Sequence, residues 1–167
     1  MPAIKLPYPV AKYPGYGNGL DCMGVSKAIL SEMLGTWSEV QRYQLYKELN
    51  GSVILVGDSK KAFEMMNESL EQNIPLLVGV DYKLSSPGNA DGTTYHFVVI
   101  IGRGYDDSKQ QYYYNYIETG RSKDYSNDAV SNQNRLYYDE QNGTFTGEKW
   151  NKKDIYKLVQ IRPLKKK

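Results

Sequence analysis

The sequence contains only one cysteine and one histidine among its 167 residues. A single thiol excludes an internal disulfide framework. Zinc sites normally take three or four nitrogen, sulfur or oxygen ligands, so one Cys and one His disfavour a metal centre. The glycines at positions 15, 17 and 19 lack the spacing of a phosphate-binding loop. We therefore expect no metal and no cofactor.

Long apolar segments are also missing. No run of 18 apolar residues occurs, and residues 1–15 do not contain the apolar core of a secretory signal peptide. The sequence thus predicts a soluble protein without a membrane span. Such a protein is either cytoplasmic or exported by a secretion system that needs no cleavable signal.

The composition is that of a folded domain, with 40% hydrophobic and 24% charged residues. The length fits a single domain over residues 1–167, with an extended arm at 1–14 and a basic tail at 163–167. The net charge is only +2, although residues 152–167 carry seven basic side chains and one acidic. We interpret the tail as a solvated end and expect no nucleic-acid partner, because the tyrosine-rich runs are not themselves basic.

Helical periodicity dominates the first half of the chain. From Cys22 to Gly35 apolar residues recur at every fourth position, and Asp21 stands where an N-cap would stand. A capping-box pattern predicts a second helix over residues 38–50, and an apolar face predicts a third over 60–72.

Strand patterns dominate the second half. A polar loop is expected over residues 83–93, and a longer one over 119–134. Helices followed by a meander of strands predict an α+β fold, in which N-terminal helices pack on a C-terminal antiparallel sheet. The predicted strands cover residues 76–80, 96–102, 112–117, 135–139, 144–147 and 155–161.

The single cysteine lies where a helix is expected to begin. At such a position the unpaired backbone N–H groups and the positive end of the helix dipole favour thiolate over thiol. Cys22 is therefore a candidate nucleophile, although a free cysteine is more often a small buried hydrophobe.

The single histidine begins an apolar strand, directly after a polar loop. In the hairpin that follows, a turn near Asp107 and Ser108 brings His96 opposite Thr119 or Glu118. An acidic side chain there would set the imidazole tautomer and stabilise its cation. We prefer Glu118 as this orienting residue, and Asn115 is the alternative if the turn forms earlier.

The order of these features resembles the papain-like cysteine peptidases, and in particular their bacterial C39-like and NlpC-like branches. The strongest motif is NIPLLVGVDY followed by DGTTYHFVVIIGRG, and CMGVSKAIL is the second. The resemblance spans about residues 15–162. It implies a papain-like fold in which Cys22 is the nucleophile, His96 the general base and acid, and Glu118 the orienting residue. The family usually has Asp or Asn in the third place.

The resemblance also implies an activity and partners. It implies a cysteine hydrolase that cleaves an amide bond through a thioester, with bacterial cell-wall peptide as the first choice of substrate. A secreted amidase effector of this kind would have an inhibitory immunity protein as a partner. The alternatives are a protein- or leader-peptide-processing peptidase, an acyltransferase with the same triad, or a non-catalytic module that binds peptide or glycan.

The remaining expectations concern the oxyanion hole and the tyrosines. Many papain-like members have a Gln shortly before the Cys that helps to form the oxyanion hole; it is missing here, and Asn18 is the candidate replacement. The 16 tyrosines gather on predicted strands, where they are expected mainly to pack across the sheet. The alternative is that some of them, together with Trp37 or Trp150, line a ligand cleft.

Overall fold

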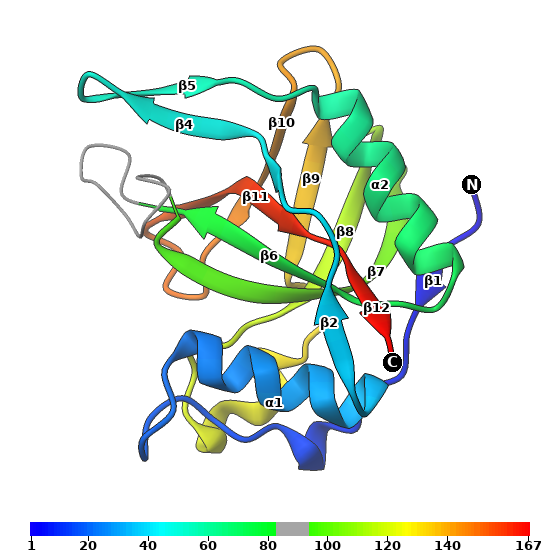
Figure 1. The fold of residues 1–167 in the computed structure, drawn as a ribbon, viewed down its shortest axis with the longest axis vertical. Coiled ribbons are helices and arrows are strands. Elements are labelled where there is room, and N and C mark those ends of the chain that lie inside the picture. Colours follow the sequence, from blue (N-terminus) through cyan, green and yellow to red (C-terminus); the bar gives the residue numbers. More distant parts are fainter. Residues whose placement is uncertain (83–93) are drawn as a thin grey trace.

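The computed structural model describes residues 1–82 and 94–167, and its centre is a closed barrel of antiparallel strands (Figure 1). Strand β8 pairs with β7 on one side and β9 on the other, which closes the barrel. The loop expected over residues 83–93 lies outside the described residues. Around the barrel the strands are β7 (His96–Asp106), β6 (Leu76–Asp81), β11 (Ile155–Arg162), β10 (Thr144–Glu148), β9 (Arg135–Asp139) and β8 (Gln111–Ile117).

Shorter elements surround this barrel. The strands outside it are β1 (Ile4–Lys5) beside β7, β3 (Tyr43–Gln44) beside β11, the pair β2 (Trp37–Glu39) and β12 (Leu164–Lys166), and the hairpin of β4 (Tyr46–Leu49) and β5 (Ser52–Leu55). The helices are α1 (Cys22–Leu34), α2 (Ser59–Glu71) and α3 (Ser126–Ala129), with 3₁₀ turns at Val10–Lys12 and Lys123–Tyr125. In Figure 1, α1 lies below the barrel, and α2 lies along its upper right side. No helix in the described ranges is both long and apolar enough to cross a membrane.

The predicted α+β fold is wrong, and so is the papain-like arrangement of helices packed on an open sheet. The described structure is mostly β and has only short helices. Its main strands form a closed barrel instead of an open sheet covered by helices. Closure needs curvature, which register shifts in β7, between Ile100 and Gly102, and in β11, between Leu158 and Gln160, can supply. Neither the shifts nor the pairing of β8 with both neighbours is visible in local sequence periodicity.

The helix expected over residues 38–50 is also wrong, because this segment forms β2, β3 and β4. Its aromatic residues favour strands. Asn50 and Gly51 both have positive φ, 51° and 82°, and form the two-residue turn between β4 and β5. Asn-Gly between strands is a strong hairpin signal, and here it forms a hairpin turn where the end of a helix is predicted.

The other two long helices lie where they were predicted. Asp21 caps α1 by accepting a hydrogen bond from the Gly24 amide, and Gly35 ends the helix with a φ of 71°. In the basic tail the side chains of Lys165, Lys166 and Lys167 are exposed, whereas Leu164 is buried and β12 pairs with β2. The N-terminal arm is likewise attached, since β1 pairs with β7.

Tyrosines form a large part of the core. Tyr114, Tyr116 and Tyr156 are almost completely buried, and Tyr138 stacks on Phe145 with ring centroids 4.5 Å apart. The expectation that the strand tyrosines mainly pack within the sheet is therefore confirmed for these residues. Their ring area supplies hydrophobic burial while each hydroxyl still needs a polar partner.

Candidate active site

The single cysteine begins α1, next to the barrel wall. Ser26, one turn further on, is fully buried and lies 2.8 Å from the carbonyl of Cys22 and 3.4 Å from that of Phe97 in β7. Its hydroxyl thereby joins the first turn of α1 to the beginning of β7. This attachment places Cys22 beside His96, the first residue of β7.

The side chains of His96 and Glu118 are in direct contact. His96 Nε2 lies 2.6 Å from Glu118 Oε1, and both residues are buried. The backbone register differs from the one predicted, because Val99 pairs with Ile117 and the hairpin turn lies slightly later in the chain. Glu118 follows the last residue of β8, so its side chain still reaches the imidazole.

Glu118 is held by three donors. Besides His96, its carboxylate accepts hydrogen bonds from the Tyr156 hydroxyl at 2.7 Å and from the Gly120 amide at 2.9 Å. Complete burial alone would raise the pKa of this carboxyl, but the donors and the charge of His96 outweigh it and lower the pKa. Glu118 is therefore ionised at neutral pH and available to stabilise a cationic imidazole.

The Cys22 thiol and the His96 imidazole interact closely enough for each to shift the pKa of the other. Burial raises the pKa of the Cys22 thiol, but the hydrogen bond and charge of His96 reverse this, and the pKa is lowered. Burial lowers the pKa of His96, whereas its bonds to Cys22 and Glu118 raise it, with a net rise to about 9. Opposite shifts of this kind favour a thiolate–imidazolium pair, which is the activated form of a nucleophilic cysteine.

The two remaining predicted site residues lie elsewhere. Asn115 pairs with Gly102 in the barrel wall and donates a hydrogen bond to the carbonyl of Asn132, so the imidazole is oriented by Glu118 instead. Asn18 is exposed in the tight turn between Gly17 and Leu20, with a φ of 52°. This turn leads directly into α1, which keeps Asn18 near Cys22 along the chain.

The segment before Cys22 is attached to the segment after Glu118. The amide of Tyr16 and the hydroxyl of Tyr13 both donate to the carbonyl of Arg121, at 2.8 and 2.7 Å. The segments that carry Cys22 and Glu118 are thereby joined by a second route, besides the interaction of both side chains with His96. Such support limits independent motion of the two groups.

A pocket of about 150 Å³ lies over His96. Two partly exposed aromatic residues, Tyr16 and Trp150, contribute to its wall. The ring of Tyr156 stacks on the imidazole with centroids 5.5 Å apart. The lining residues are Tyr16, Tyr82, His96, Gly120, Lys149, Trp150 and Tyr156. The histidine of the pair is thus accessible to a small part of a ligand.

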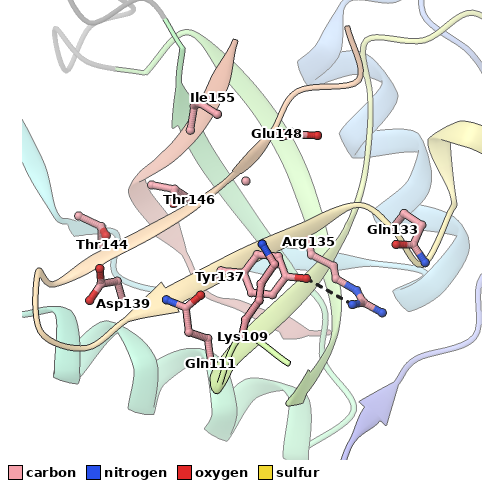
Figure 2. Close-up of a pocket in the computed structure, with 11 residues that line it drawn as sticks. Lys109, Gln111, Gln133, Arg135, Tyr137, Asp139, Thr144, Thr146, Glu148 and Ile155 are labelled. Atoms are coloured by element: carbon pink, nitrogen blue, oxygen red, sulfur yellow. Dashed lines mark hydrogen bonds between the residues drawn. The ribbon is translucent and has the colours of Figure 1, made fainter. Parts of the chain in front are cut away.

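A second pocket, of about 440 Å³, lies on the outer face of β9 and β10 (Figure 2). Its polar groups largely bind one another: Arg135 Nη1 lies 3.3 Å from the Tyr137 hydroxyl, which in turn lies 3.0 Å from Asp106. None of the predicted site residues lines it. We therefore place the candidate site at His96.

Sequence reasoning missed several residues of the site. Tyr156 lies on a correctly predicted strand, but its contact with Glu118 depends on how the barrel closes. Apart from its charge, nothing in the sequence marks Lys149 as a site residue. Nothing marks Gly120 except its position after Thr119. Within residues 1–82 and 94–167, no three His, Cys, Asp or Glu side chains gather in a way that could hold a metal ion.

Comparisons of the chain with protein-family models, with curated proteins and with solved structures find no match.

Proposed function

We propose that this protein is a cysteine hydrolase that cleaves an amide bond through a thioester intermediate. The observation that carries the proposal is the buried contact between Glu118 and His96, whose imidazole also interacts with the thiol of Cys22. A nucleophile, a base and a group that orients the base are the parts that such a reaction needs. A merely structural cysteine would not need an ionised carboxylate behind its histidine partner.

The steps follow from the protonation states. The Cys22 thiolate attacks the carbonyl carbon and forms a C–S bond, which gives a tetrahedral oxyanion. The oxyanion collapses, the C–N bond breaks, and the His96 imidazolium gives its proton to the departing amine. Neutral His96 then takes a proton from water, whose oxygen attacks the thioester. When the C–S bond breaks, the acid leaves and the thiolate–imidazolium pair is restored.

The first turn of α1 offers donors for the oxyanion. The amides of Gly24 and Val25 are bonded to Asp21, the first to its side chain and the second to its carbonyl. The amides of Cys22 and Met23 come before these, at the positive end of the helix dipole. We assign the Cys22 amide to the oxyanion hole, and Asn18 remains a predicted second donor.

For the substrate we retain the expectation from the sequence resemblance, which is a peptide of the bacterial cell wall. A protein substrate is the second choice. The small pocket over His96 and its aromatic walls support a substrate that places only a short polar segment beside the histidine.

The test compares the wild-type protein with Cys22→Ala on purified peptidoglycan and on casein, with products identified by mass. We expect turnover by the wild type and none by Cys22→Ala. Lys27→Ala, an exposed change on the same helix, is the matched control and should retain activity. Equal turnover by wild type and Cys22→Ala would refute the mechanism, as would no turnover of any amide by a folded wild type.

A further inference from the structure

Lys149 lies at the edge of the pocket over His96 in an unusual environment for an ammonium. Only about 15% of its side chain is exposed, and Nζ lies 3.9 Å from the centroid of the Tyr82 ring and 5.8 Å from that of Trp150. Among the described residues it forms a long ion pair with Asp154, whose carboxylate oxygen lies 3.9 Å from Nζ, which is beyond hydrogen-bonding distance. Among the residues described, none accepts a hydrogen bond from this ammonium.

An ammonium with three donors is costly to remove from water unless an acceptor replaces the lost hydration. The aromatic faces compensate part of the charge, but they accept no conventional hydrogen bond. A ligand with an anionic oxygen in the pocket would supply the missing acceptor. A carboxylate fits best, because the pocket volume of about 150 Å³ suits a small planar group.

The neighbouring surface is aromatic and carries charges of both signs. Lys149 and Trp150 also line a larger adjoining pocket of about 520 Å³, which includes Arg121 and Lys152 but also Asp128 and Glu148. The Arg121 guanidinium is held between the rings of Tyr125 and Trp150, at 3.9 and 4.3 Å from their centroids, and forms an ion pair with Asp128 at 3.4 Å. Because Arg121 is already paired, Lys149 is the cation that we consider for an anionic group in the pocket over His96.

We infer that this cleft selects substrates with a carboxylate close to the scissile amide, and that Lys149 binds that carboxylate. The inference rests on the proposed hydrolase function, since it concerns the same cleft. The carboxylate can come from an acidic side chain or from the C-terminus of a peptide, and both sources share the chemistry that Lys149 recognises.

The single cysteine allows a test that needs no known substrate. Iodoacetate and iodoacetamide both alkylate a thiolate: an S–C bond forms, the C–I bond breaks and iodide leaves. The two reagents differ in size very little, but only iodoacetate carries a carboxylate. The ratio of their rate constants at Cys22, measured by mass spectrometry, therefore reports the preference of the cleft for a carboxylate.

We expect Lys149→Met to lower the iodoacetate-to-iodoacetamide ratio by about threefold to tenfold, as for one partly desolvated charge pair. Lys149→Arg should retain most of the preference, because it keeps the charge. Lys153→Met is the matched control, since it removes one exposed positive charge outside both pockets and should leave the ratio unchanged. An equal ratio in wild type and Lys149→Met, or an equal fall in Lys153→Met, would overturn the inference.

Peptide pairs then separate the two sources of the carboxylate. Wild type and Lys149→Met are compared on cleaved peptides with Glu or Gln beside the scissile bond, and with a free or amidated C-terminus. A preference for one of the two acidic peptides that disappears in Lys149→Met identifies the source of the carboxylate. Equal cleavage within both pairs contradicts the inference about Lys149 but not the hydrolase proposal. If no amide is cleaved but the alkylation ratio still depends on Lys149, the hydrolase proposal fails and the carboxylate site stands.

Discussion

Replacing Glu118 by glutamine should separate the charge of the orienting residue from its shape. Glu118→Gln keeps an acceptor near His96 Nε2 but removes the negative charge that lies 2.6 Å away. A hydrogen bond to a charged group is worth about 1.5–3 kcal/mol. Because one pKa unit corresponds to about 1.4 kcal/mol, we expect the His96 pKa to fall by about one to two units from its value near 9.

The thiol of Cys22 reports this change. In the wild type, we expect alkylation by iodoacetamide to begin at a pH well below the usual Cys pKa and to rise again near pH 9, where the imidazolium loses its proton. In Glu118→Gln the imidazolium is less stable, so the lower transition should move towards the usual Cys pKa. Glu140→Gln, an exposed matched change, should leave the profile as it is. Superimposable profiles for wild type and Glu118→Gln would refute the assignment of Glu118.

The same substitution should alter stability with a defined sign. The pKa of His96 is higher in the folded protein, about 9, than its ordinary value of 6.5. Its stabilising contribution is therefore fully present below pH 6.5 and is lost as the pH rises through 9. For His96 alone the difference corresponds to about 3 kcal/mol, and the lowered pKa of Cys22 offsets part of it, because that contribution grows as the pH rises towards the usual Cys pKa. Urea unfolding at pH 6 and pH 10 should show this loss in the wild type and a much smaller one in Glu118→Gln.

Two further changes test the support around the pair. Tyr156→Phe removes the hydroxyl that donates to Glu118 Oε2, so we expect the pKa of the Glu118 carboxyl to rise. The acid limb of the pH–rate profile should then move to higher pH, and turnover at pH 6 should fall about tenfold. An unmoved acid limb would contradict this role of Tyr156. Gly120→Ala would place a Cβ 3.2 Å from Glu118 Oε1 and 3.3 Å from His96 Cε1, so we expect at least about a tenfold lower kcat with an unchanged circular-dichroism spectrum. Wild-type turnover by a folded Gly120→Ala protein would show that the pocket tolerates the added methyl.

Local patterns predicted the elements that depend on neighbouring residues. Helix α1 begins at Cys22 because Asp21 supplies the cap, and α2 follows the apolar face recognised between residues 60 and 72. The contact between His96 and Glu118 was also predicted, because a hairpin brings together residues that are close in sequence. The predicted register was shifted, but a long carboxylate side chain tolerates such a shift.

The failures have a local part and a long-range part. The segment from Trp37 to Leu49 carries both a capping-box pattern and aromatic residues, and the Asn-Gly turn after it is a local hairpin signal that favours strand. Its β2 and β3 pair with the distant strands β12 and β11. The lysines of the tail are exposed, as expected, but Leu164 is buried beside β2. These distant pairings could not be read from a window of neighbouring residues.

The sequence by itself determined that only one Cys–His pair is possible, since the chain has one residue of each kind, and it placed them at a helix start and a strand start. Only the tertiary structure decided what surrounds them. Tyr156 and Lys149 reach the site because β11 and the end of β10 come round the barrel to β6 and β7. Barrel closure is a cooperative result of pairings between distant strands, so no local pattern encodes which side chains meet across it.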